Sequence, residues 1–158
     1  MRAKHGFPPL FDKESTTLIL GSFPSVASRK QEFFYGHPQN RFWKVLSLCF
    51  NEDAPTTIEE KTSFCKKHHI ALYDSIESCE IKGSSDSSIT DVVPADLSEI
   101  YDMSPIKLIV FNGNASEKWF KKYQSIPNGI EEIKMPSTSP ANAAFSLERL
   151  VQEWKKAF

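Results

Sequence analysis

The chain has 158 residues, of which 40% are hydrophobic and 25% charged, and its formal net charge at pH 7 is −1. This length fits one compact domain, so we expect a single domain over residues 1–158. The apolar runs are much shorter than the roughly 20 residues that cross a bilayer, which excludes a membrane-spanning protein. Met1–Pro9 lacks the apolar stretch of a signal peptide. This predicts a cytosolic protein, or a nuclear one in a eukaryotic host.

The charge and the cysteines limit the possible partners and cofactors. Proteins that bind nucleic acids often carry a strong basic excess, so a charge near zero weighs slightly against DNA without excluding a local basic patch. Cys49, Cys65 and Cys79 are odd in number and widely spaced. They indicate neither a disulfide framework nor a structural zinc site. We therefore expect no metal ion and no cofactor.

Buried strands alternate with amphipathic helices along the chain. The hydrophobic pattern predicts strands at residues 16–20, 70–74, 107–112 and 130–135. It predicts helices at residues 40–50, 57–68, 94–101, 115–123 and 143–156, the second of them capped by Thr56 or Thr57. This order is typical of the α/β class. We expect three layers, α/β/α, around a central, mostly parallel, four-stranded sheet.

In an open parallel sheet the functional site lies outside the carboxyl ends of the strands. The loops expected there are Gly21–Ser25, Asp74–Ser78, Asn112–Ser116 and Pro136–Asn142. They are rich in Ser, Asn, Gly and Pro, and poor in Lys and Arg. Small hydroxyls and free main-chain amides suit close approach to phosphates or to the edge of a base. Turn formation is the better explanation for any one loop, but four such loops at one edge weaken that explanation and point toward a binding site.

An aromatic segment follows the first of these loops. Phe33, Phe34 and Tyr35 precede a Gly-His-Pro sequence and are expected to lie in a loop. A flat ring can stack on an extruded base with a gain of roughly 1–3 kcal/mol per base. Burial of the same rings, to fix the loop on the surface, is the alternative. His37, in the same segment, is a lone loop histidine of the kind that usually makes an ordinary surface hydrogen bond.

Three segments resemble motifs of the uracil-DNA glycosylase superfamily. Leu-Ile-Leu-Gly-Ser-Phe-Pro-Ser at 18–25 matches its first motif, a strand that runs into a G-x-x-P turn. Residues 35–46 are very similar to the following segment of the mismatch-specific uracil-DNA glycosylases. Pro-Ser-Thr-Ser-Pro-Ala-Asn-Ala at 136–143 resembles the second motif, whose loop enters the DNA minor groove. The resemblance runs from about Leu18 to Trp154 and implies an enzyme that flips a base out of the duplex.

Two positions depart from the uracil-specific branches. Phe23 stands where those branches carry the Asn or Asp that positions the attacking water, and Met135 stands where they often carry His or Asn. This pattern is similar to that of the hypoxanthine-DNA glycosylase group. In that branch the asparagine of H-P-x-N is taken to be catalytic, and here it is Asn40. Asp74 ends the strand at the position where relatives hold a base-reading Asn.

The resemblance implies a monofunctional, monomeric DNA glycosylase that hydrolyses the N-glycosidic bond of a deaminated base in DNA. Asn40 is the expected catalytic residue. The expected base pocket comprises Gly21, Ser22, Phe23, Phe34, Tyr35, Asp74 and Asn112. The expected DNA contacts are Ser25, Ser137, Thr138, Ser139, Pro140, Ala141 and Asn142.

Several alternatives remain open from the sequence. Asn40 could instead be the N-cap of the helix that follows it, and the two roles are compatible. The same fold could act on uracil in mismatches, as the middle motif suggests. The two missing polar groups and the low charge suit a catalytically silent module that binds damaged or single-stranded DNA. An enzyme acting on free nucleosides is a further alternative, and its binding would be insensitive to salt.

Overall fold

A computed structural model describes residues 2–158 and contains a parallel sheet of four strands in the order β3-β2-β6-β7. The strands are β2 (Thr17–Gly21), β3 (Ile70–Asp74), β6 (Leu108–Asn112) and β7 (Glu131–Met135). Each lies within one residue of its predicted position. All three pairings are parallel, so the four carboxyl ends meet at one edge, as the sequence predicted.

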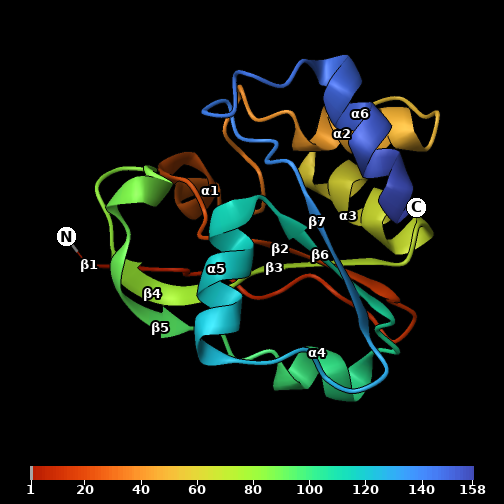
Figure 1. Cartoon of the computed structure of the whole chain (residues 1–158). Helices are drawn as coiled ribbons and strands as arrows, with labels where there is room; N and C mark the ends of the chain where they lie inside the picture. The colour runs from red at the N-terminus through yellow and green to blue at the C-terminus, as the bar shows by residue number, and fades with distance from the viewer. Residues whose placement is uncertain (1) are drawn as a thin grey trace.

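Helices cover the sheet on two sides, which confirms the predicted three-layer α/β/α architecture (Figure 1). One group comprises α2 (Phe42–Cys49), α3 (Ile58–Lys67) and α6 (Leu147–Trp154). The other comprises α4 (Ser98–Met103) and α5 (Asn114–Tyr123). Short helices are α1 (Val26–Gln31) and the 3-10 turns η1 (Asp86–Ser88) and η2 (Lys155–Ala157). Within residues 2–158, every helix is too short or too polar to cross a bilayer.

A second, antiparallel sheet was not predicted. Its order is β1-β4-β5, from β1 (Arg2–Lys4), β4 (Ile76–Glu80) and β5 (Thr90–Pro94). The predicted loop Asp74–Ser78 is therefore wrong, since a strand begins two residues after Asp74. Ile76 and Cys79 are buried in a small apolar cluster, which anchors β4 although its sequence is largely polar.

Two predicted helices begin later than expected because side chains bind their first residues. The helix expected over residues 40–50 begins at Phe42, whose main-chain N–H donates to the side-chain oxygen of Asn40. The helix expected over residues 143–156 begins at Leu147, with Ser146 as its N-cap. Thr57 caps α3 in a complete capping box, as one of the two predicted candidates.

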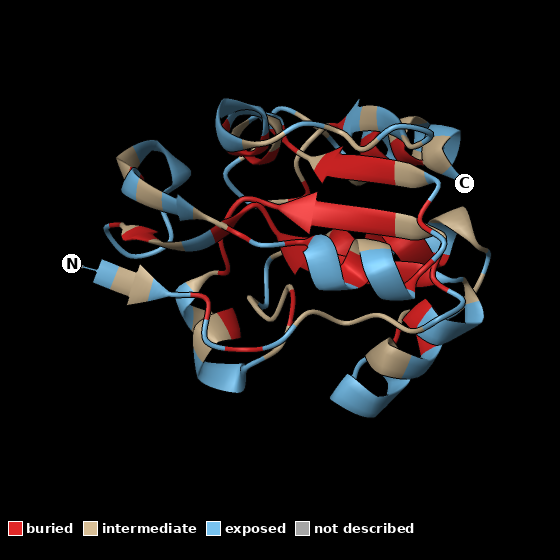
Figure 2. Ribbon diagram, turned by 90° about the horizontal axis from the view of Figure 1, so that it is seen from below, coloured by how far each residue is buried: buried red, intermediate tan, exposed pale blue. Residues whose placement is uncertain are grey.

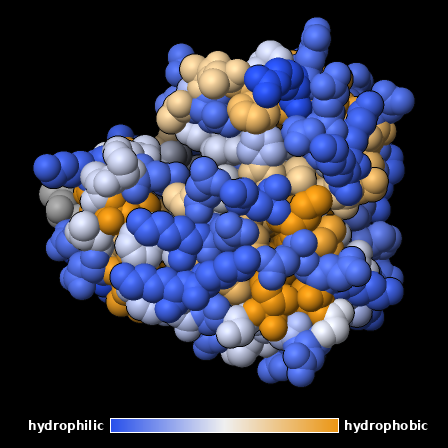
Figure 3. All heavy atoms as spheres, in the orientation of Figure 1, coloured by the Kyte–Doolittle hydropathy of each residue, from blue (hydrophilic) through white to orange (hydrophobic). Residues whose placement is uncertain are grey.

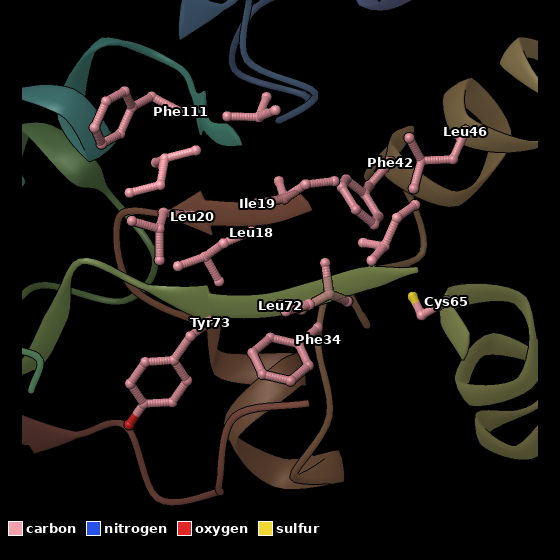
Figure 4. Packing of buried hydrophobic residues seen from close by; sticks show 14 of the residues in the cluster. Leu18, Ile19, Leu20, Phe34, Phe42, Leu46, Cys65, Leu72, Tyr73 and Phe111 are labelled. Atoms are coloured by element: carbon pink, nitrogen blue, oxygen red, sulfur yellow. The ribbon is translucent and has the colours of Figure 1, made fainter. Parts of the chain in front are cut away.

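Most buried side chains form one core around the four-stranded sheet (Figure 4). Strands β2, β3 and β6 of this sheet are largely buried, whereas the edge strand β7 and the outward faces of the helices are largely exposed (Figure 2). The small cluster mentioned above is separate and contains Phe23, Ile76, Cys79, Ile81, Ile89 and Trp119. Hydrophilic side chains dominate the face in Figure 3, with hydrophobic ones in scattered patches.

Candidate active site

A pocket of about 240 Å³ opens at the carboxyl ends of β2, β3 and β6. Pockets for drug-sized ligands occupy about 300–1,000 Å³, so this one suits a smaller ligand. Most of the residues predicted for the site line it. They are Gly21, Ser22, Phe23, Ser25, Tyr35, Asn40, Asp74, Asn112, Ser137, Thr138, Ser139, Pro140 and Ala141. Four further lining residues were not predicted for the site: Ser28, His37, Ser84 and Asp86.

Gly21 and Asp74 are opposite each other at the ends of β2 and β3. A Cβ atom on residue 21 would overlap Asp74 Oδ1 and would lie 3.1 Å from the hydroxyl oxygen of Tyr35. Glycine is therefore needed here for space and not for its main-chain freedom. The two polar side chains consequently converge over the α-carbon of Gly21.

Tyr35 presents a buried hydroxyl to this pocket. Its ring stacks on that of Phe42, with the centroids 3.8 Å apart, and its φ of 52° lies in the left-handed region. Among residues 2–158, no group meets the hydroxyl with good hydrogen-bond geometry. Burial raises the pKa of this hydroxyl, the charge of Asp74 raises it further, and an interaction with the Asn112 side chain opposes the rise. The group therefore stays protonated and can donate to a ligand or accept from one.

Asn40 lies in a hydrogen-bond network that joins three loops. Its Oδ1 accepts from Phe42 N and from the hydroxyl of Thr138, both at 2.9 Å. Asn112 in turn exchanges two hydrogen bonds of 3.0 Å with Thr138, one to its hydroxyl and one from its main-chain N–H. A main-chain N–H can only donate, so the atom of Asn40 that faces Phe42 is the oxygen. The Nδ2 amide of Asn40 is thus the part left for a ligand or water.

Arg41 holds the second-motif loop in place, a role that the sequence analysis missed. Its guanidinium donates to the carbonyl oxygens of Phe145 and Asn142, and its main-chain N–H donates to Thr138 O at 3.1 Å. These contacts keep the carbonyls outside α6 and explain why that helix starts late. Five fixed donors on a planar group suit arginine to such a bracing role.

Asp74 is paired with a histidine from the start of the chain. His5 is fully buried, and its Nε2 lies 2.7 Å from Asp74 Oδ2. Its Nδ1 lies 3.0 Å from the carbonyl oxygen of Phe7, and its main-chain N–H donates to Glu77 O at 2.8 Å. The ring of Tyr73 covers the imidazole, with the centroids 4.2 Å apart. Nothing in the sequence pattern pointed to His5, because its partner is 69 residues away.

A second carboxylate comes from the connection between β4 and β5. Asp86 lies at the pocket mouth, where its Oδ1 accepts a 2.8 Å hydrogen bond from the Ser22 hydroxyl. Desolvation raises the pKa of Asp86, and the nearby Asp74 adds to this, whereas the Ser22 hydrogen bond opposes it. Phe23 lies beside this contact with its ring under the Arg29 guanidinium, 5.3 Å away. Asp86 thus supplies a carboxylate to the pocket beside the first-motif loop, which has Phe23 where the uracil-specific branches have Asn or Asp.

Three predicted residues have other positions or contacts than expected. Phe34 is only 3% exposed and packs in the core against Phe7 and Tyr73, so it does not line the pocket and stacking on a base is wrong for this residue (Figure 4). Asn142 faces an adjoining groove, and its amide donates to Ser137 O at 3.0 Å. Ser25 lines the pocket, but its hydroxyl also caps α1.

The pocket is polar and contains no arrangement typical of a metal centre. Among residues 2–158, no three or more His, Cys, Asp or Glu side chains are grouped so that they could hold a metal ion. The three cysteines are free thiols, and none of them lines the pocket. The available chemistry is therefore that of amides, hydroxyls, carboxylates and one histidine pair.

Comparison with known proteins gives consistent results. The family model of the uracil DNA glycosylase superfamily matches residues 8–158. Two curated relatives are both named hypoxanthine DNA glycosylase. The one from Methanosarcina acetivorans is 35% identical over 157 residues, and the one from Methanosarcina barkeri is 33% identical, each match covering 98% of both chains.

A solved structure extends the likeness to three dimensions. It is the solution NMR structure of a candidate uracil DNA glycosylase from Methanosarcina acetivorans, with a TM-score of 0.83 and 34% sequence identity. The match covers 99% of this chain and 96% of that one. The motifs, the sheet order and these matches agree, and the chain belongs to the uracil DNA glycosylase superfamily.

Proposed function

We propose that this DNA glycosylase acts on deaminated purines and hydrolyses the N-glycosidic bond of hypoxanthine in DNA. The observation that carries the proposal is the convergence of Asn40, Asp74 and Tyr35 on one base-sized pocket. The first-motif loop beside it has Phe23 where the uracil-specific branches have Asn or Asp. The names of the two Methanosarcina relatives support the same substrate. We further propose that the protein acts as a monomer, in the cytosol or in the nucleus of a eukaryotic host.

The pocket chemistry suits a base that carries an N–H on its Watson–Crick edge. Asp74 Oδ1 is an acceptor at the pocket floor, and the neighbouring Tyr35 hydroxyl can act as donor. Hypoxanthine presents an N–H at position 1 and a carbonyl oxygen at position 6. Adenine presents an acceptor at position 1, so its lone pair would face Asp74 Oδ1 with no proton between the two acceptors. Buried polar groups that lose their partners discriminate strongly against the wrong ligand.

Bond cleavage develops positive charge on the sugar and negative charge on the leaving base. Fixed dipoles and charges that already point at these positions lower the barrier. We infer that Asn40 orients the attacking water through Nδ2, because its oxygen is occupied by Phe42 and Thr138. Asp86, beside Ser22 at the mouth of the pocket, would stabilise the positive charge on the sugar. Main-chain amides near Ser22 would meet the negative charge on the base.

The loop from Ser137 to Asn142 is the proposed DNA contact. Its hydroxyls are partly used within the loop, where Ser137 Oγ accepts from Ser139 N at 3.1 Å and Ser139 Oγ accepts from Ala141 N at 3.2 Å. These bonds make the loop rigid before DNA arrives. Such a loop can contact phosphates while Pro140 and its neighbours probe the minor groove.

Single-turnover release of base tests the proposal. Duplexes carrying deoxyinosine, deoxyxanthosine or deoxyuridine at one labelled position would be incubated with excess enzyme, and abasic sites would be counted. Faster release from inosine supports the proposal. Faster release from uridine would assign the protein to mismatch-uracil repair, and tight inosine binding without any release would indicate a silent binding module. Cleavage of free inosine would indicate a nucleoside hydrolase.

A further inference from the structure

We propose that His5 is a positioning residue which shares a proton with Asp74 and so keeps the base-facing acceptor of the pocket free of net charge. The inference rests on the proposed function, because Asp74 is taken to face the leaving base. It concerns a residue outside all three motifs, located after the short strand β1. Three observations carry it: the two contacts of the imidazole, the complete burial of the pair, and the direction of the second carboxylate oxygen.

The contacts of His5 fix the number of protons. The carbonyl oxygen of Phe7 can only accept, so the Nδ1 atom 3.0 Å away carries a hydrogen. Nε2 and Asp74 Oδ2 are 2.7 Å apart, and two lone pairs cannot approach so closely without a proton between them. The pair therefore holds one proton more than a neutral imidazole beside a carboxylate. Its net charge is zero, whichever atom the shared proton is nearer.

Burial makes this neutrality important. His5 is fully buried and Asp74 is 4% exposed and reached only from the pocket, so water screens a charge on the pair poorly, and least when a base fills the pocket. An unpaired buried charge is costly, whereas a paired one can be retained. The ring of Tyr73 on one side and Phe7 on the other complete the apolar surroundings of the imidazole. A carboxylate without the histidine proton would be strongly destabilised at this position.

The remaining carboxylate oxygen faces the pocket. Oδ2 is held by His5, while Oδ1 is the atom that a Cβ on Gly21 would overlap. A bare carboxylate here would accept the N–H of the base but would also repel the negative charge that develops on the leaving purine. The shared proton removes this repulsion and leaves the acceptor in place. Asp86 already adds one acidic group to the pocket, so a second uncompensated charge would act against base release.

The first experiment compares His5→Gln with a matched control, His68→Gln. His68 makes an equivalent 2.7 Å contact between Nε2 and Glu52 Oε2, remote from the pocket lining. Glutamine keeps a hydrogen-bond donor but brings no additional proton. We expect His5→Gln to lower the maximum single-turnover rate of hypoxanthine release about tenfold to hundredfold, less than the roughly hundredfold to thousandfold lost with a group that directly contacts the developing charge. The enzyme concentration at half-maximal rate should change much less, and His68→Gln should match wild type.

A rescue separates charge from structure. Adding Asp74→Asn to His5→Gln removes the uncompensated charge while the amide oxygen remains an acceptor, so part of the lost rate should return. A purely structural role for His5 predicts that the double variant is no faster than His5→Gln. Equal rates for His5→Gln and His68→Gln would also overturn the inference.

A measurement on the wild-type protein keeps the inference testable even where His5→Gln does not fold. Nitrogen-15 shifts of the His5 ring and the carbon-13 shift of the Asp74 carboxyl group together count the protons in the pair. A doubly protonated imidazole, or a protonated carboxyl group, supports the inference. An ionised Asp74 beside a singly protonated His5 overturns it. If the wild type releases no base, the proposed function fails, and this proton count still stands as a separate test.

Discussion

The hydroxyl of Thr138 donates a 2.9 Å hydrogen bond to the side-chain oxygen of Asn40, 98 residues away in the sequence. The same oxygen accepts from the main-chain N–H of Phe42 at the start of α2. Arg41 occupies the N-cap position of α2, so the proposed catalytic residue, one position earlier, both binds the first N–H of the helix and links it to the second-motif loop. Removing the whole side chain would disturb all three roles at once, so a test of catalysis has to separate them.

Asn40→Ala and Asn40→Asp separate these roles. Alanine removes the cap and the bond to Thr138, and we expect it to destabilise the fold by about 1 kcal/mol. Aspartate keeps an oxygen for Phe42 and Thr138 but lacks the Nδ2 amide. We expect both variants to release hypoxanthine about a hundredfold more slowly, with near wild-type melting only for Asn40→Asp. Normal single-turnover release by destabilised Asn40→Ala would leave Asn40 as a cap alone.

Gly21→Ala should abolish the pocket geometry without changing the fold. The added methyl group would overlap Asp74 Oδ1 and press on the Tyr35 hydroxyl. We expect at least a tenfold loss of release, because displacement of positioned groups by a fraction of an ångström is costly. Gly36→Ala is the control, since its methyl group would meet only the flexible end of Gln31. Equal activity of the two variants would show that Asp74 is not needed where it lies.

Tyr35→Phe should lower activity while leaving stability unchanged or raised. The hydroxyl is buried without a well-formed hydrogen bond among residues 2–158, so its removal relieves a desolvation cost. If the hydroxyl binds the base, release should slow by roughly fivefold, equivalent to one hydrogen bond of about 1 kcal/mol. Thermal melting and single-turnover rates, measured together, test this. A drop in melting temperature would mean that the hydroxyl has a structural partner.

Phe23→Asn tests whether the first loop sets the choice of base. Restoring the amide found in the uracil-specific branches should raise uracil release. Phe23 is 8% exposed within the small apolar cluster, so the change should cost stability by about 3 kcal/mol. Phe23→Leu, which keeps an apolar side chain without the amide, is the control. Unchanged uracil release in Phe23→Asn would show that the rest of the pocket selects the base.

Asp86→Asn tests the raised pKa of this carboxyl group. Because the folded-state pKa lies above the ordinary value near 3.8, the folded protein binds more protons than the unfolded chain between the two values. This contribution to stability is present at low pH and is lost as the pH rises through that window. Asp86→Asn should thus be at least as stable as wild type at pH 7, and the difference should vanish below about pH 4.

The same variant tests the catalytic use of the ionised carboxylate. The wild-type release rate should rise with pH through the pKa of Asp86, and this limb should flatten in Asp86→Asn, with a lower plateau. Asp91→Asn is the control, because Asp91 lies in the adjacent strand β5, is highly exposed and pairs with Arg2. Equal pH profiles for wild type and Asp86→Asn would exclude Asp86 from the chemistry.

Strands β2, β3 and β6 of the central sheet could be predicted because they are short apolar runs that end in glycine or polar residues. Leu18 to Leu20 and Ile109 to Phe111 are almost fully buried, and such segments have few other structures available. Strand β4 could not be predicted. Its pattern Ile-Glu-Ser-Cys-Glu becomes a strand only through its pairing with β1 and β5 and through the burial of Ile76 and Cys79.

The residues of the site likewise fall into those that the sequence could predict and those that it could not. Most of the motif residues predicted for the site line one pocket, because parallel strands bring their carboxyl ends together, whereas Asn142 faces the adjoining groove. His5, Arg41 and Asp86 act through contacts with residues 64 to 104 positions away. The prediction that Phe34 lines the base pocket was wrong. Phe34 and Tyr35 both carry an aromatic ring, and the main-chain direction decides which ring enters the core and which lines the pocket. Local sequence carries no information on such choices.

Strand β1 is three residues long and pairs only with β4, at the edge of the small sheet. Short edge strands open at far lower free energy than a central sheet, so this segment should detach transiently while the core stays folded. His5 follows this strand directly, and each opening would withdraw the imidazole from Asp74. Warming should thus inactivate the enzyme, reversibly, several degrees before circular dichroism records any loss of structure, and the main-chain amide of His5 should exchange with solvent earlier than those of β2.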